Sequence, residues 1–125
     1  NAALDSAKAA RVAAEEKWRQ ARGAQIFSLP EVLQNSTIQR LQEEKARVQA
    51  EYQQKLRVYQ PDYPEMQQLR GRMNELDTQI NSLAASVRNS IQGQYVVALN
   101  QERSLQAQVD GLKGDVLDLR NRSVQ

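Results

Sequence analysis

Apolar residues between positions 66 and 87 recur at alternating spacings of three and four. This spacing is typical of a helix in a left-handed coiled coil. The run comprises Met66, Leu69, Met73, Leu76, Ile80, Leu83 and Val87. After Val87 the rhythm slips to four-residue steps through Ile91 and Tyr95, and it recovers from Leu105 onward. Added four-residue steps unwind a supercoil locally without ending the helix. The pattern predicts one long helix over residues 63–122.

Two further helices are predicted upstream. Residues 37–59 place Ile38, Leu41 and Leu56 on one face, and Ser36 is expected to cap this helix. Residues 1–22 are alanine-rich with a narrow stripe of small residues, and Gly23 is expected to end that helix in the left-handed conformation. Periodicity lapses over residues 23–35, which we interpret as a connector.

Two prolines separate the second and third helices. Proline lacks the backbone N–H that a helix interior needs, and it disfavours helical geometry in the preceding residue. The expected turn covers residues 60–63, and its defining residues are Pro61, Asp62, Tyr63 and Pro64. Asp62 is expected to cap the third helix, with Pro64 in its first turn.

These elements predict an all-α fold, a single long antiparallel coiled-coil hairpin spanning residues 1–125 with one broken arm. Helix 37–59 would pair with the first half of helix 63–122, and helix 1–22 with the second half. Counting back from the turn places the connector opposite residues 87–100. The alternative is a three-helix zigzag in which the first helix folds back at Gly23. The expected apolar seam between the arms comprises Leu41, Val48, Leu56, Leu69, Met73, Leu76, Ile80, Leu83, Val87, Leu105, Val109, Leu112, Val116 and Leu119.

Composition agrees with thin helical seams better than with a globular core. The 125 residues are 40% hydrophobic and 5% aromatic, with a mean hydropathy of −0.73. The net charge of +2 comes from interspersed signs, which disfavours nucleic-acid binding. No apolar run approaches the ~20 residues of a membrane span.

The residue types also restrict the chemistry. Without His or Cys the chain has no imidazole base, no thiolate nucleophile and no ordinary zinc site. Adjacent carboxylates such as Glu43 and Glu44 point about 100° apart on a helix and do not converge on one atom. We therefore expect no enzymatic activity, no cofactor and no metal site.

Glycines inside the long helix indicate an interface. Gly71 and Gly93 each lower helix propensity by about 1 kcal/mol relative to Ala. Close approach of another helix would offset that cost, so both are candidate interface residues. A lone hairpin also leaves much of a thin apolar seam exposed to water, so we expect a homo-oligomer.

A family resemblance is carried by the turn and its flanks. The segment reads YQPDYPEMQQLRGRMNELDTQI, and SLPEVLQNSTIQRLQEEKARVQAEYQQKL precedes it. Together they resemble the periplasmic helical hairpin of bacterial polysaccharide co-polymerases, the Wzz/Wzc-type chain-length determinants and exopolysaccharide-transport proteins. The family's usual turn is Tyr-x-Pro-x-His-Pro. Here Tyr59, Pro61 and Pro64 match, while Tyr63 stands where His is commoner.

The resemblance implies a role and a location. It implies an inner-membrane protein whose periplasmic domains form a ring and regulate the chain length and export of a polysaccharide. The implied partners are further copies, a polysaccharide polymerase and an outer-membrane export protein. The membrane would be reached through segments outside this chain. Some members carry a cytoplasmic tyrosine-kinase domain, whose nucleotide-binding motifs are not in this sequence.

Two other functions agree with a long hairpin. One is the α-hairpin of a periplasmic adaptor protein in an efflux or type I secretion system, which is flanked by lipoyl-like β segments. The other is a cytoplasmic scaffold coiled coil. Flanking sequence would distinguish all three.

Overall fold

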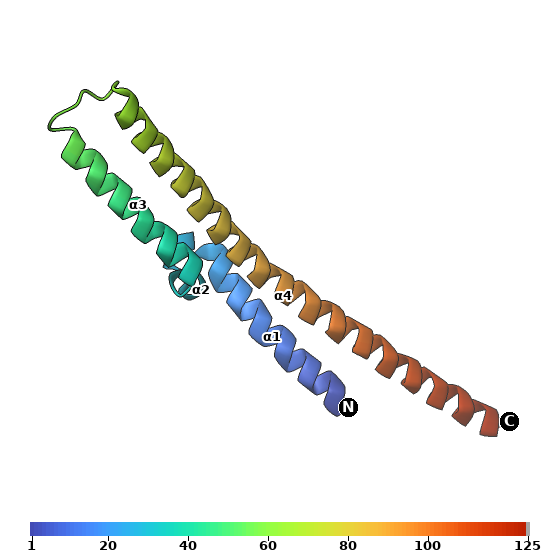
Figure 1. Cartoon of the computed structure of the whole chain (residues 1–125). Coiled ribbons are helices and arrows are strands. Elements are labelled where there is room, and N and C mark those ends of the chain that lie inside the picture. Colours follow the sequence, from blue (N-terminus) through green and yellow to red (C-terminus); the bar gives the residue numbers. More distant parts are fainter. Residues whose placement is uncertain (125) are drawn as a thin grey trace. The chain divides into compact units, whose positions relative to one another are not determined.

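The computed structural model describes residues 1–124, with the backbone alone for Val124, and these residues are helical throughout apart from short connections. The first helix, α1, spans Ala2–Gly23. A 3-10 helix, η1 (Ile26–Ser28), and a short helix, α2 (Pro30–Leu33), follow. Helix α3 covers Ser36–Lys55, and α4 covers Pro64–Val124 (Figure 1). The all-α prediction is confirmed.

Backbone contacts divide the chain into two units, where the sequence predicts one domain. One unit holds residues 1–23 with those from Ser90 onward, and the other is Ala24–Asn89. Helix α4 passes through both without interruption. Within the first unit α1 runs antiparallel beside the later part of α4, and within the second α3 runs antiparallel beside its earlier part (Figure 1).

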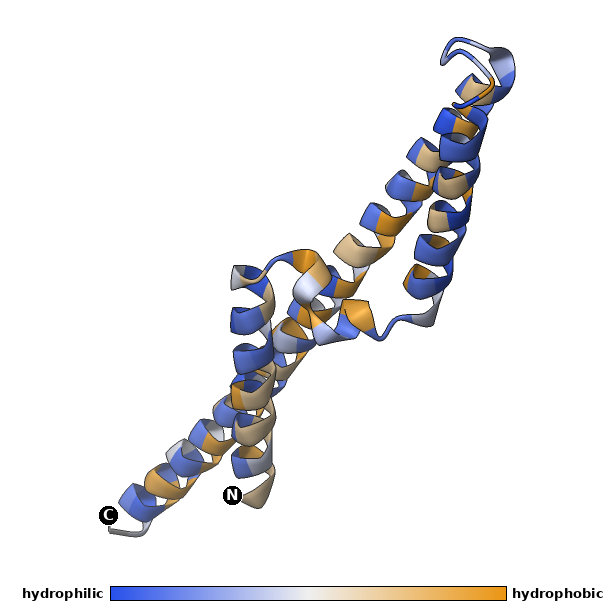
Figure 2. Ribbon diagram, turned by 90° about the vertical axis from the view of Figure 1, so that its left-hand side faces the viewer, coloured by the Kyte–Doolittle hydropathy of each residue, from blue (hydrophilic) through white to orange (hydrophobic). Residues whose placement is uncertain are grey.

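The unit of residues 24–89 has a thin apolar core. Polar residues cover most of α3 and α4, with hydrophobic positions interspersed along each helix (Figure 2). The buried residues are Leu29, Val32, Ile38, Met66, Leu76, Ile80 and Ala84. Met66 and Leu76 are 0% exposed, so the seam is dry at its centre despite its narrow width. Leu29 and Val32 show that the connector adds apolar residues to this core.

The first unit is held by smaller residues. Leu4, Ala21 and Ile91 are its buried residues, and Trp18 is half-buried. The alanine-rich sequence of α1 suits this arrangement because a small side chain lets a partner helix approach closely. The Arg11 guanidinium donates to the Glu102 carboxylate at 2.7 Å, which fixes α1 against α4. The zigzag alternative is therefore wrong, since it would place α1 against α3.

The connector lies beside only a short stretch of α4. Arg88 donates to the carbonyl of Ala24 at 2.8 Å, while Thr37, at the start of α3, lies beside Leu83. The chain between Ala24 and Thr37 therefore leaves the seam and returns to it between Leu83 and Arg88. The prediction that the connector lies opposite residues 87–100 is wrong, because η1 and α2 coil the chain outward instead of extending it along α4.

Several helix ends differ from their predicted positions. Asn35, not Ser36, caps α3, and its side chain accepts from the Ile38 amide at 2.9 Å. Gly23 is the last residue of α1, and no glycine among residues 1–124 has a positive φ. Helix α3 ends at Lys55 instead of residue 59, because the chain continues in tighter turns from there. Helix α4 begins at Pro64, one residue after the predicted start.

We predict that Leu76→Ala lowers the free energy of unfolding by about 2–5 kcal/mol, because it leaves a cavity in a fully buried site. The matched control is Leu117→Ala on the same helix, where the side chain is 57% exposed and the expected loss is below about 0.5 kcal/mol. Urea unfolding followed by circular dichroism measures both. Similar losses for the two variants would show that the seam does not run through Leu76.

Candidate functional site: the hairpin turn and the helix seam

The hairpin turn begins with a tightening of the last turn of α3. The amide of Val58 donates to the Lys55 carbonyl at 3.0 Å, and the amide of Tyr59 donates to the same oxygen at 2.8 Å. A second hydrogen bond, from the amide of Tyr63 to the carbonyl of Gln60 at 3.0 Å, closes a turn around Pro61. The turn is thus built from two hydrogen-bonded bends in succession, and Gln60 begins the second.

The start of α4 is organised by Tyr63 and Pro64. The Tyr63 carbonyl accepts from the amides of Met66 at 2.9 Å and Gln67 at 3.1 Å, so Tyr63 stands at the N-cap position. Pro64 is the first helical residue, where its missing N–H costs nothing. The prediction that Asp62 caps this helix is wrong, since the cap lies one residue later and Glu65 pairs with Lys55.

Aromatic and apolar side chains are exposed at the turn. The rings of Tyr59 and Tyr63 stack with centroids 4.6 Å apart and an interplanar angle of 4°. They are 36% and 44% exposed, and Val58 beside them is 78% exposed. We call Val58, Tyr59 and Tyr63 the turn surface.

Ion pairs join α3 to α4 along the seam. The Lys55 ammonium donates to Glu65 of α4 and to Glu51 of α3, and these hydrogen bonds raise the pKa of the lysine. Lys45 lies 2.5 Å from the Asp77 carboxylate. A third pair, between Glu44 and Arg72, also crosses the seam and raises the pKa of Arg72. These pairs cross between the two helices in the observed register, and because they are half-exposed they contribute little stability.

Arg11 and Glu102 form the corresponding contact in the first unit. Arg11 also binds Glu15 of its own helix at 2.6 Å, and the two carboxylates raise the pKa of the guanidinium. In return, the hydrogen bond from Arg11 lowers the pKa of Glu102 below its ordinary value of 4.5. The Glu102 side chain is only 15% exposed, so this is the most sheltered ion pair of the unit.

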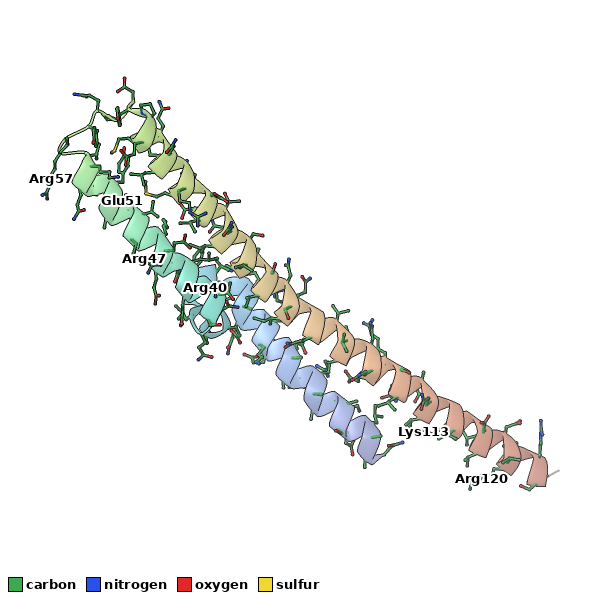
Figure 3. The ribbon with its side chains drawn as sticks, in the orientation of Figure 1. Arg40, Arg47, Glu51, Arg57, Lys113 and Arg120 are labelled. Atoms are coloured by element: carbon green, nitrogen blue, oxygen red, sulfur yellow. The ribbon has the colours of Figure 1, made fainter. Side chains whose placement is uncertain are left out.

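The outer face of α3 carries charges. Arg47 projects from the side of α3 that faces away from α4, and Arg40 and Glu51 belong to the same helix, while Arg57 lies two residues beyond its end (Figure 3). All four are exposed. Basic and acidic residues are interspersed along α3 from Arg40 to Lys55, so this helix has no concentrated positive stripe.

The described residues give no sign of a metal centre or a membrane span. No group of three or more acidic residues among positions 1–124 is placed to hold a metal ion. Likewise, no helix in the described part of the chain is long and apolar enough to cross a membrane.

The predicted seam residues fall into three classes. Leu76 and Ile80 are buried. Nine others are half-buried: Leu41, Val48, Leu56, Leu69, Met73, Leu83, Val87, Leu105 and Val109. Leu112, Val116 and Leu119 are 62%, 62% and 63% exposed, so their expected burial within the chain is wrong. Asn1, the residue before α1, lies beside Val109 and Leu112.

The two candidate interface glycines lie on the surface. Gly71 and Gly93 are exposed, and a Cβ built at either would meet no atom within 4 Å. Within residues 1–124, therefore, the space above both glycines is open. That they form an interface stays a prediction.

Comparison with known proteins adds no relative. No family model, no curated protein and no solved structure matches the chain. The resemblance to polysaccharide co-polymerases therefore enters only as a proposal below.

Sequence reasoning missed two structural residues and one ion pair. Ala84 is fully buried. The sequence pattern did not indicate this, because the adjacent Leu83 is the stronger apolar signal. Asn35 is a good capping residue whose signal was masked by the adjacent Ser36. The pairing of Arg11 with Glu102 depends on the register of α1, which the length of the connector does not reveal.

We predict that Glu102→Gln makes the stability of the fold less sensitive to low pH. A carboxylate whose pKa is lowered in the folded state stabilises that state above its ordinary pKa, and this contribution is lost as pH falls through the lowered value. The wild-type melting temperature should exceed that of Glu102→Gln by a constant amount above pH 4.5 and by less below it. Thermal unfolding at a series of pH values measures the difference.

The matched control for that experiment is Glu16→Gln. Glu16 pairs with Arg19 of the same helix at 3.2 Å, and both side chains are more than half exposed. This variant should show a smaller difference from wild type at every pH, because exposed pairs within one helix contribute little. A Glu102→Gln difference that does not change with pH would contradict the role assigned to Arg11.

We predict that replacing both Pro61 and Pro64 by Ala favours open, exchanged dimers over the closed hairpin. Alanine restores the N–H groups and permits helical geometry through the turn, so α3 and α4 can join into one helix. Sedimentation velocity measures the dimer fraction and circular dichroism the added helix. Ala substitution of Gln53 and Gln54, which are exposed in α3, is the control. An unchanged mass and helix content in the proline variant would show that the prolines do not set the turn.

Proposed function

We propose that this chain is the non-catalytic periplasmic coiled-coil arm of a polysaccharide co-polymerase, which supports oligomerisation and the regulation of polysaccharide chain length and export. The observation that carries the proposal is the turn, in which Tyr59, Pro61 and Pro64 occupy the positions of the family's motif. The structure supports it in one respect: these residues lie where two paired antiparallel helices are joined.

The exposed surfaces support a role in assembly. The turn surface presents stacked tyrosine rings and Val58 at one end of the hairpin. Gly71 and Gly93 leave space on the surface of α4, into which a helix of a second copy would fit closely. The chain also lacks the imidazole and thiol groups on which most catalytic sites rely. These features therefore favour an arm that makes protein contacts over an arm that catalyses a reaction.

The partners and the location rest on the resemblance. They are further copies of the protein, a polysaccharide polymerase and an outer-membrane export protein. The arm would lie in the periplasm, with attachment to the bacterial inner membrane through segments outside this chain. Any tyrosine-kinase activity would belong to a domain outside it as well.

We predict that Gly71→Leu or Gly93→Leu changes polysaccharide chain length or reduces export in a cell that makes the cognate polymer. The folded chain has room for the larger side chain, and leucine is the better helix former, so the hairpin itself should be as stable as before. The added bulk would instead separate neighbouring copies. Gel analysis of polymer length and immunoblotting of the membrane fraction measure the two effects.

The matched control is Gln94→Leu, which adds similar bulk at an exposed position one residue from Gly93, on another side of the helix. It should leave polymer length unchanged. If normal amounts of both glycine variants gave the wild-type length distribution and the wild-type oligomer, the proposal that these glycines form the interface would be rejected.

A further inference from the structure

A pocket opens where the connector packs against the pair of α3 and α4. It has a volume of about 320 Å³ and is lined by Phe27 of η1 together with residues of both helices. All of its lining residues belong to the unit of residues 24–89. Ligand pockets in proteins begin at about this size, roughly 300 Å³. The pocket therefore has room for a small ligand.

Phe27 gives the pocket an aromatic wall. It is the only phenylalanine of the chain, and it is 38% exposed although Leu29 and Val32 of the same connector are buried. Contact with a ligand would remove this apolar surface from water. The face of an aromatic ring is negatively polarised, so it attracts C–H groups that carry a small positive charge. The wall therefore suits a ligand that presents a C–H face.

Three exposed amide side chains line the same pocket, those of Gln42 and Gln49 from α3 and of Asn81 from α4. Each amide has two N–H donors and one carbonyl acceptor. A hydroxyl group also donates and accepts, so an amide can bind a hydroxyl in either direction. The pocket thus combines an aromatic wall with groups that match a ligand rich in hydroxyls.

The charged residues of the pocket favour a neutral ligand. Lys45 and Asp77 line the pocket and pair with each other at 2.5 Å, so their charges offset one another. An anionic ligand would have to compete with Asp77 for the lysine, and a cationic ligand would have to compete with Lys45 for the carboxylate. A neutral ligand leaves the pair intact.

We propose that this pocket binds a neutral hexopyranose unit. Such a ring presents C–H groups on its face for contact with Phe27, and its hydroxyl groups lie around its edge, where the three amides can bind them. The inference rests on the proposed function for the source of the ligand, because a polysaccharide is a chain of such rings. A second depression in the same unit, beside Leu41 and Leu83, has no aromatic side chain in its lining and serves as an internal control.

Nuclear magnetic resonance titration of the full chain, labelled with nitrogen-15, tests the pocket. The probes are the methyl glycosides of glucose, galactose, mannose and N-acetylglucosamine. At least one should shift the side-chain amide signals of Gln42, Gln49 and Asn81 to saturation, with a dissociation constant on the order of millimolar, because a small ligand gains little affinity per atom. Signals of Thr37 and Ser82, which line the second depression, should not shift. No saturable shift with any of the probes would overturn the proposal.

Substitutions at Phe27 separate an aromatic contact from a simple apolar one. Phe27→Tyr keeps the ring and should bind the glycoside as wild type does. Phe27→Leu keeps apolar bulk but loses the ring, so it should raise the dissociation constant roughly threefold to tenfold. Circular dichroism checks that both variants keep the wild-type helix content. Equal affinities of the two variants would overturn the proposal.

Asn81→Ala tests the polar side of the pocket at an exposed position. It should also raise the dissociation constant roughly threefold to tenfold, through the loss of a hydrogen bond. The matched control is Asn74→Ala, which removes an exposed amide of α4 outside the pocket and should leave the affinity unchanged. Equal affinities of these two variants would contradict the assigned role of the amides.

A neutral peptide is the competing ligand, because its backbone also donates and accepts hydrogen bonds. N-acetyl-alanyl-alanine amide should bind more weakly than the best glycoside, and tighter binding of this peptide would overturn the proposal. The titrations use the purified chain, so they do not depend on polymer length in cells. Absence of glycoside binding would reject the pocket alone, whereas wild-type polymers from the Gly71 and Gly93 variants would reject the assembly role alone.

Discussion

The structure depends on a narrow apolar seam along one continuous helix. Helices α1 and α3 each bury only part of one face, and neither has a core apart from its contact with α4. Most of the stability of such helices comes from packing an amphipathic face, so each short helix depends on keeping its register with α4. The ion pair of Lys45 with Asp77 and that of Arg11 with Glu102 cross between the paired helices in this register, one in each unit.

The connector is compact and adds to the core of its unit. Because η1 and α2 coil outward between Ala24 and Thr37, they bury Leu29 and Val32 while using little of the length of α4. A segment without apolar periodicity thus still contributes buried side chains.

The sequence predicts the helices and the turn well, because both depend on local physics. Heptad spacing identifies α4, and the prolines locate the turn, since proline acts within one or two residues of itself. The register of α1 could not be predicted, because it depends on the compact path of residues 24–35, which contain no periodic signal. The caps at Asn35 and Tyr63 differ from prediction by one residue, since neighbouring polar residues offer similar caps. For the candidate site, the residue types restrict the possible chemistry. The exposure of Leu112 and Gly93 could be recognised only from the folded structure.

Two kinds of exposed surface on α4 would contribute differently to an assembly. Leu112, Val116 and Leu119 are exposed apolar side chains on one face of α4. Gly71 and Gly93 offer space without shaped or charged groups, so they permit close approach but discriminate little between neighbouring registers. In the proposed oligomer, exposed apolar side chains would gain by burial in any contact, whereas the glycine positions would limit how closely two helices approach.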